Sequence, residues 1–146
     1  MPDKLDLLTE WKGDVLLVGL DGRLAAAAAD RLVRKIDTTI GIVTGSLRAV
    51  ILNCSKMNYV SGYGWHSILQ IGRSLRSRGS RLLLAELQPD IRVVFENSSF
   101  LGLLSVHDTV AEAHDSLRRS RRSIRRGWAS AKRMARMARP RRITTT

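Results

Sequence analysis

The residues whose chemistry stands out surround a predicted helix start near Gly64. Ser61 and Tyr63 carry hydroxyls that a kinase could phosphorylate. Gly62 and Gly64 could bring backbone N–H groups close to a bound anion. A helix cap is the favoured role for Ser61, because serine is a preferred N-cap. Tight turns are the favoured role for the two glycines, because neighbouring glycines commonly serve them. Tyr63 and Trp65 offer an aromatic anchor for a partner protein, with burial of Trp65 in the core as the equal alternative.

The remaining polar residues do not assemble a catalytic or metal site. His66, His107 and His114 are far apart and lack cysteine or paired acidic neighbours, so they are interpreted as structural. Cys54 is the only cysteine, which rules out an internal disulfide, and its place at the end of a predicted strand suits a small buried hydrophobe. The pattern therefore predicts a protein that is not an enzyme, binds no metal or cofactor, and takes no small-molecule substrate.

Strands and helices that could position these residues alternate along the chain. Short apolar runs predict strands at 15–20, 49–52, 82–85 and within 101–106, with a hairpin partner for the first at 5–11. Apolar residues at helical spacing predict helices at 25–40, 65–78, from Pro89, and at 110–117 after a Thr109 cap. The stretch 53–64 is predicted to be a loop. This order favours a mostly parallel sheet with right-handed crossovers.

Positive charge is concentrated at the C-terminus. The chain of 146 residues carries a net charge of +12 and a pI near 11.3. Twelve of its 25 Lys and Arg residues follow Leu117, where no acidic residue occurs. The first 117 residues are balanced, with 13 basic and 13 acidic groups. The sequence therefore predicts a neutral domain over 1–117 and a basic tail over 118–146.

The basic tail has an amphipathic pattern. Its apolar residues fall on one helical stripe that ends before Pro140, and arginines and lysines fill the rest. Such a helix suits binding to an anionic membrane or to an acidic protein partner, and binding to nucleic acid is less favoured. The alternative is that the tail is disordered and serves only to keep the protein in solution. The residues singled out for contact are Arg118, Arg119, Arg121, Arg122, Arg125, Arg126, Trp128, Lys132 and Arg133.

The sequence does not predict export or membrane insertion. The first 30 residues contain acidic groups and no uninterrupted apolar segment of the kind that a signal peptide needs. No run approaches the ~20 apolar residues of a membrane-spanning helix. The expected location is the cytoplasm, with attachment at the membrane surface through the tail as the alternative.

The segment that begins in the predicted strand at 49–52 resembles a known family. It runs from Val50 to Gly64 and reads VILNCSKMNYVSGYG. Asn53-Cys54-Ser55 stands where the STAS family has Asp-Leu-Ser, and Tyr59-Val60 stands where it has an aromatic–aliphatic pair. Further landmarks follow the family's order, at LDGRL (20–24), GSRL (79–82) and SVHDTVAEA (105–113). Over residues 13–117 the chain therefore resembles a STAS domain of the anti-sigma factor antagonist type.

The resemblance implies a fold and a regulatory role. The expected fold is a STAS-like α/β domain, with a four- to five-stranded mixed, mostly parallel sheet, helices mainly on one face and a basic C-terminal helical extension. The implied function is signalling in transcription regulation, in which the domain docks an anti-sigma factor or serine kinase through the loop and N-terminus of its second helix. The expected contact residues are Asn58, Tyr59, Ser61, Gly62, Tyr63, Gly64, Trp65 and Ser67.

The chain departs from the family pattern at the regulatory position. The serine that is phosphorylated in the family corresponds to Gly62, with Ser61 before it and Tyr63 after it. A kinase that positions one oxygen for in-line transfer does not readily accept a shifted one, so we expect no phosphoserine switch, with Ser61 as the less favoured acceptor. The alternative function is that of an accessory subunit of a lipid-transport ABC complex, with the tail on the anionic membrane.

Overall fold

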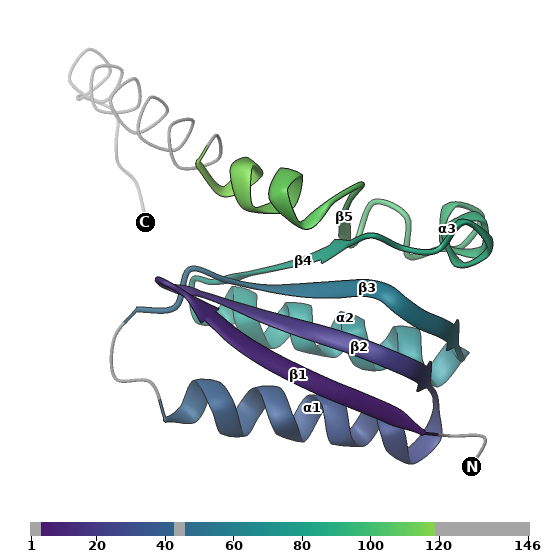
Figure 1. The fold of residues 1–146 in the computed structure, drawn as a ribbon, viewed down its shortest axis with the longest axis horizontal. Helices are drawn as coiled ribbons and strands as arrows, with labels where there is room; N and C mark the ends of the chain where they lie inside the picture. The colour runs from purple at the N-terminus through teal and green to yellow at the C-terminus, as the bar shows by residue number, and fades with distance from the viewer. Residues whose placement is uncertain (1–3, 43–45, 119–146) are drawn as a thin grey trace, which may run out of the picture. The chain divides into compact units, whose positions relative to one another are not determined.

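Strands and helices alternate along the chain (Figure 1) in the computed structural model, which describes residues 4–42 and 46–118. The expected tail contacts from Arg119 onward lie outside the described residues. The strands are β1 (Leu5–Lys12), β2 (Val15–Leu24), β3 (Ala49–Val60), β4 (Arg81–Ala85) and β5 (Ser105–His107). The helices are α1 (Ala26–Gly41), α2 (Gly62–Ser77) and α3 (Pro89–Glu96), and residues 110–118 are also helical. The described residues up to Ala113 form one compact unit.

Within the described residues, five strands form one mixed sheet in the order β1-β2-β3-β4-β5. β1 pairs antiparallel with β2, and the pairs from β2 to β5 are parallel. The β1–β2 hairpin closes at Lys12 and Val15, where Gly13 adopts φ +62°, a left-handed conformation that favours glycine. This arrangement confirms the expected mostly parallel sheet and the alternating order of the elements.

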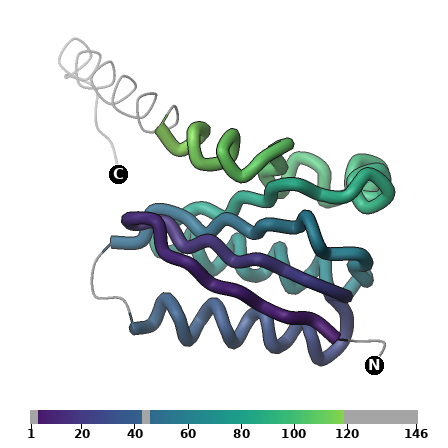
Figure 2. The backbone as a smooth tube through the Cα atoms, viewed as in Figure 1, coloured from purple at the N-terminus to yellow at the C-terminus, as the bar shows by residue number. Residues whose placement is uncertain are grey.

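The hydrophobic core lies between the sheet and two helices. α1 and α2 contact each other and lie on one face of the sheet (Figures 1 and 2). α1 buries a stripe at helical spacing that includes Ala28, Leu32 and Ile36. β2 and β3 send alternate residues, among them Val18 and Leu52, into the same cluster. Burying one such large apolar side chain contributes about 1.5–3 kcal/mol, so these stripes hold the layers together.

β3 extends well beyond the apolar run that predicted it. The predicted loop at 53–64 is instead mostly strand, because β3 continues to Val60. Its polar residues pair with the C-terminal part of β2, which extends to Leu24 and does not end at the predicted turn. The connection is reduced to Ser61, and α2 begins at Gly62. Pairing with a neighbouring strand therefore overrides a local sequence that is rich in polar residues.

The C-terminal part of the described chain follows the predicted order with small shifts. α3 begins at Pro89, where the missing N–H of proline costs no helical hydrogen bond. The strand predicted within 101–106 begins later, as β5, because Gly102 turns the chain with φ +91°. The Thr109 hydroxyl accepts a hydrogen bond from the Glu112 N–H at 3.0 Å, as expected of a helix cap. Within the described residues, no helix is long and apolar enough to cross a lipid bilayer.

Candidate functional site

Two β-bulges shape the end of β3. The register between β2 and β3 shifts between Gly19 and Asp21 and again between Gly22 and Arg23, and each shift leaves one extra residue on β3. The bulges break the alternation of buried and exposed side chains along the strand. The successive residues 58 and 59 of β3 are therefore both exposed. Bulges are common beside functional sites, because they redirect side chains.

Hydrogen bonds hold the bulged part of β3 in place. The Asn53 Oδ1 accepts a hydrogen bond from the Ser55 N–H at 3.0 Å. The side-chain amide of Gln88, which precedes α3, donates to the Ser55 carbonyl oxygen at 3.0 Å. The strand is thus fixed both by its own side chain and by the start of α3, so the end of β3 presents a defined surface.

Ser61 caps α2 with its side chain. Its Oγ accepts a hydrogen bond from the Gly64 N–H at 2.9 Å and donates to the Leu24 carbonyl oxygen at 3.5 Å. The Ser61 N–H donates to the same carbonyl oxygen at 3.1 Å. The hydroxyl therefore joins the tip of α2 to the end of β2, which confirms the prediction of an N-cap.

Two glycines at the tip of α2 have different roles. A Cβ atom added at Gly64 would lie 2.4 Å from the Leu24 carbonyl oxygen and 3.0 Å from Val60 Cγ1, so a side chain there would push α2 away from β2. An added Cβ at Gly62 would meet nothing within 4 Å, and this glycine is exposed. Gly64 is therefore required by packing, whereas Gly62 leaves the first turn of α2 open.

Trp65 and Ser67 lie beneath the surface of the helix tip. Trp65 is 4% exposed, and its ring centroid lies 5.6 Å from that of Phe95 and 5.9 Å from that of Phe100. Ser67 is also buried. The interpretation of Trp65 as a core residue is thus confirmed. These two side chains support the expected contact surface from within and do not form part of its exterior.

The two exposed tyrosines of the expected site, Tyr59 and Tyr63, each contact a half-buried charged side chain from another element. The Arg23 guanidinium lies 4.1 Å from the centroid of the Tyr59 ring, a cation–π contact. Tyr63 is 53% exposed, and its hydroxyl donates a hydrogen bond to the Asp30 carboxylate. This hydrogen bond, together with the negative charge of Asp30, raises the pKa of Tyr63 above its ordinary value. We call this region the docking surface, formed by Arg23, Asp30, Asn58, Tyr59, Gly62 and Tyr63.

The docking surface gathers residues from the C-terminal ends of β2 and β3 and from the N-terminal parts of α1 and α2. These are the carboxyl ends of parallel strands, where open α/β sheets usually place their binding sites. The sequence-based set omits Arg23 and Asp30. Arg23 lies within the LDGRL landmark, which is a signal that could have included it. The contact between Asp30 and Tyr63 depends on the packing of α1 beside α2, for which the local sequence holds no signal.

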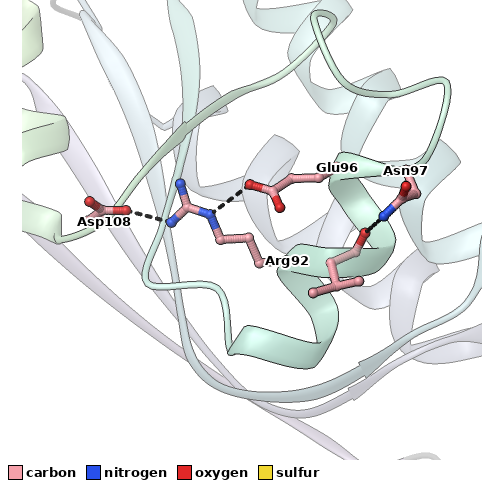
Figure 3. Close-up of polar contacts among 5 residues, drawn as sticks. Arg92, Glu96, Asn97 and Asp108 are labelled. Carbon is pink, nitrogen blue, oxygen red and sulfur yellow. Dashed lines mark hydrogen bonds and ion pairs between the residues drawn. The ribbon is translucent and has the colours of Figure 1, made fainter.

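α3 lies beside the bulged strand and is fixed by charged contacts. Figure 3 shows the Arg92 guanidinium between Glu96 and Asp108. Its Nη1 lies 2.5 Å from Asp108 Oδ1, and its Nε lies 3.4 Å from Glu96 Oε2. The hydrogen bond that Arg92 donates to the Asp108 carboxylate is the main cause that raises the pKa of Arg92. The adjacent Val93 and Val94 are both exposed, so α3 offers a small apolar patch of its own.

Backbone strain occurs where two parallel strands end. Ala26 follows β2 with φ +49°, and Glu86 follows β4 with φ +62°. This left-handed conformation costs a residue other than glycine about 1–2 kcal/mol. The Glu86 Oε2 accepts a hydrogen bond from the Val110 N–H at 3.0 Å. This hydrogen bond helps to hold the turn at Glu86 in its strained conformation.

The side chains at this edge of the sheet suit molecular recognition. No group of three or more His, Cys, Asp or Glu residues that could hold a metal ion occurs within 4–42 and 46–118. Burial is the main cause that raises the pKa of Cys54 to about 12, so its thiol stays protonated at neutral pH. Exposed tyrosine rings and an amide lie here beside a half-buried arginine and a half-buried aspartate, and tyrosine and arginine are typical of surfaces that bind proteins.

The family and several relatives can be named by comparison with known proteins. The STAS domain family matches residues 7–113. The "Putative anti-sigma factor antagonist BtrV" of Bordetella bronchiseptica is 33% identical over 100 residues, which cover 68% of this chain and 84% of the relative. Unphosphorylated SpoIIAA of Bacillus, an anti-sigma factor antagonist, is 24% identical with a TM-score of 0.64, over 77% of this chain and 96% of its own. An anti-sigma factor antagonist from Mycobacterium paratuberculosis is 17% identical with a TM-score of 0.70, over 81% and 97% respectively.

The solved structures confirm the expected STAS-like arrangement of the sheet and helices. The family assignment itself rests on the sequence matches, because the STAS match spans nearly all of the sheet and the Bordetella relative aligns with two thirds of the chain. The chain therefore belongs to the STAS domain family and is similar, within it, to the anti-sigma factor antagonists.

Proposed function

We propose that this protein is a regulatory module that binds an anti-sigma factor through the docking surface and catalyses no reaction itself. The observation that carries the proposal is the pair of exposed tyrosines, Tyr59 and Tyr63, at the carboxyl edge of the sheet. Tyrosine and arginine are enriched among the residues that dominate binding energy at protein interfaces. The names of the relatives, anti-sigma factor antagonists, supply the class of partner.

The docking surface is organised before any partner arrives. Arg23 stacks on Tyr59, and Asp30 accepts a hydrogen bond from Tyr63. Immobilising a mobile side chain at an interface costs about 0.5–1.5 kcal/mol, and side chains that are already held lose less. Binding through this surface therefore needs little rearrangement of the domain.

We propose that the usual phosphoserine switch is absent and that binding is constitutive. The corresponding position is Gly62, which carries no hydroxyl. The neighbouring Ser61 hydroxyl is engaged with the Gly64 N–H and the Leu24 carbonyl oxygen. Turning it toward a kinase would break a helix cap that contributes about 1 kcal/mol.

Affinity capture from a lysate of the native cells tests the class of partner. The full chain is expected to retain an anti-sigma factor, identified by mass spectrometry. The double variant Tyr59→Ala/Tyr63→Ala is expected to weaken the purified complex more than about tenfold. Trp11→Ala is the matched control, because Trp11 is as exposed as Tyr59 but lies on β1. Capture of an ABC-type ATPase in place of an anti-sigma factor would contradict the proposal and favour the accessory-subunit role.

Restoring the missing hydroxyl tests the proposed lack of regulation. Gly62→Ser adds a side chain where a Cβ atom meets nothing within 4 Å, so the fold should be retained. With a captured partner of the serine-kinase class and ATP, we expect the wild type to remain unmodified and bound. We expect Gly62→Ser to be phosphorylated and released, because a phosphate adds about −1.5 to −2 charges to the interface. Phosphorylation of Ser61 in the wild type would overturn the proposal.

We propose that the basic tail, residues 118–146, attaches the domain to the cytoplasmic surface of an anionic membrane. Its twelve basic residues and lack of acidic ones support this role, since each basic residue near anionic lipid adds about 1 kcal/mol. Vesicles that contain phosphatidylserine should sediment with the full chain at low salt and not with a chain truncated after Arg118. Equal sedimentation of the two would contradict the proposal, and capture of an acidic protein by the tail alone would assign the tail to a protein partner.

A further inference from the structure

A groove lies toward the opposite edge of the sheet from the docking surface. It is bounded by the C-terminal half of α2, the start of β4 and the turn before β5, and it encloses ≈ 440 Å³. The helix tip at Gly62 and the groove residue Arg76 belong to the same helix. At 1.5 Å per residue they are about 20 Å apart along its axis. The two surfaces are therefore far enough apart to be occupied at the same time.

Three arginines line this groove. Arg73 and Arg76 lie one turn apart on α2, and Arg81 begins β4. Within the part of the chain that the structure describes, none of the three forms an ion pair, whereas Arg48 and Arg92 each pair with a carboxylate. Like charges at this spacing repel one another. An anionic ligand would relieve that repulsion and gain charge-assisted hydrogen bonds.

The inner wall of the groove is apolar. A Cβ atom added at Gly72 would lie 3.6 Å from Leu82 Cδ2 and 4.0 Å from Leu104 Cδ2, so α2 passes close to these leucines. Leu103 is 54% exposed and follows the turn at Gly102, where φ is +91°. An exposed leucine beside these arginines gives the groove both apolar and cationic character.

We propose that this groove binds an acidic protein segment that carries an apolar side chain. Carboxylates of the segment pair with Arg73, Arg76 and Arg81, because the guanidinium group suits bidentate contact with a carboxylate. The apolar side chain packs beside Leu103. The chain's own tail is excluded as the occupant, because residues 118–146 carry only positive charge. The inference goes beyond the proposed function and does not rest on it, since the groove and the docking surface share no residue.

An NMR titration of the ¹⁵N-labelled full chain tests the proposal. The probe is the peptide Ac-Glu-Glu-Leu-Leu-Glu-Glu-NH₂, used at about 0.3 M salt, where the Debye length falls below about 8 Å and screens long-range attraction. We expect the amide signals of Gly72 and Gly102 to shift. We expect Arg73→Glu/Arg76→Glu to weaken the affinity more than about tenfold, because two charge-assisted contacts are lost. Leu103→Ser should also weaken binding while the net charge stays the same.

Two controls separate the groove from general attraction to the basic tail. Arg34→Glu/Lys35→Glu makes the same change of charge at exposed positions on α1 and is expected to preserve the affinity. A peptide with serines in place of the leucines should bind more weakly and leave the Gly72 signal in place. Chemical denaturation of each variant verifies that its fold is retained. Equal weakening by the two double variants, or equal binding of the two peptides, would overturn the proposal.

Discussion

The docking surface and the groove differ in how their polar groups are partnered. At the docking surface, Arg23 stacks on Tyr59 and Tyr63 is bonded to Asp30. In the groove, the three arginines have no carboxylate partner within the described residues. The first region therefore offers a fixed shape, and the second offers uncompensated charge. A partner of the first must fit its contours, whereas a partner of the second must bring negative charge.

The fixed shape of the docking surface depends on packing directly beneath it, and the largest expected effect comes from removing that support. Trp65→Ala deletes a side chain packed on Phe95 and Phe100 and is expected to lower the free energy of unfolding by about 3–5 kcal/mol. Tyr63→Ala should change it by less than about 0.5 kcal/mol. Urea denaturation of the two variants measures the difference. Similar losses of stability would remove the distinction between the supporting core and the exposed surface.

The two glycines at the tip of α2 test the same distinction between supporting core and exposed surface, with a smaller expected change in stability. Gly64→Ala places a methyl group 2.4 Å from the Leu24 carbonyl oxygen and is expected to cost about 1–3 kcal/mol, because backbone must move. Gly62→Ala meets no neighbour and should raise the free energy of unfolding by about 0.4–1 kcal/mol, through a less flexible unfolded chain. Thermal and chemical denaturation together measure both changes. A destabilised Gly62→Ala variant would show that the first turn of α2 is not open.

The helix cap at Ser61 makes a smaller contribution to the rigidity of the docking surface. Ser61→Ala removes the acceptor of the Gly64 N–H and is expected to lower the free energy of unfolding by about 1 kcal/mol. Ser61→Asp keeps an acceptor oxygen at the N-cap, so it should retain most of the stability. Chemical denaturation distinguishes the pair. If both variants matched the wild type, the hydroxyl would not be committed to the cap.

The smallest expected effect is a change in the titration of Tyr63. Its hydroxyl donates to Asp30, and this raises the pKa of the phenol above its ordinary value of about 10. The stabilisation is therefore present below that ordinary value and is lost as the pH rises through the raised one. In a pH titration followed by tyrosinate absorbance, Asp30→Asn should shift the transition of Tyr63 to lower pH. Tyr63→Phe should remove that transition. An unchanged curve for Asp30→Asn would contradict the contact.

Much of the fold could be predicted from the sequence. Apolar runs and helical spacing identified each strand and helix in order, because burial on one face imposes those periods. The length of β3 could not be predicted, because the polar residues after Leu52 join the sheet only by pairing with β2. The N-cap role of Ser61 followed from its residue type and position.

The surfaces themselves were harder to predict. Tyr59 and Trp65 are both aromatic residues near a helix start, and only tertiary packing against Phe95 and Phe100 distinguishes the buried Trp65 from the exposed Tyr59. The groove draws on α2, β4 and the turn near Leu103, which lie apart in the sequence and carry no shared motif. Charge and exposure at such places depend on tertiary neighbours, which local patterns do not contain.

Hydrogen exchange measured by mass spectrometry tests most directly whether the partner binds at the tip of α2. The full chain is compared alone and in complex with the captured anti-sigma factor. We predict slower exchange in the complex for peptides that cover 23–30 and 58–67. Unchanged exchange at 58–67, with protection confined to the groove peptides at 73–82, would contradict the account.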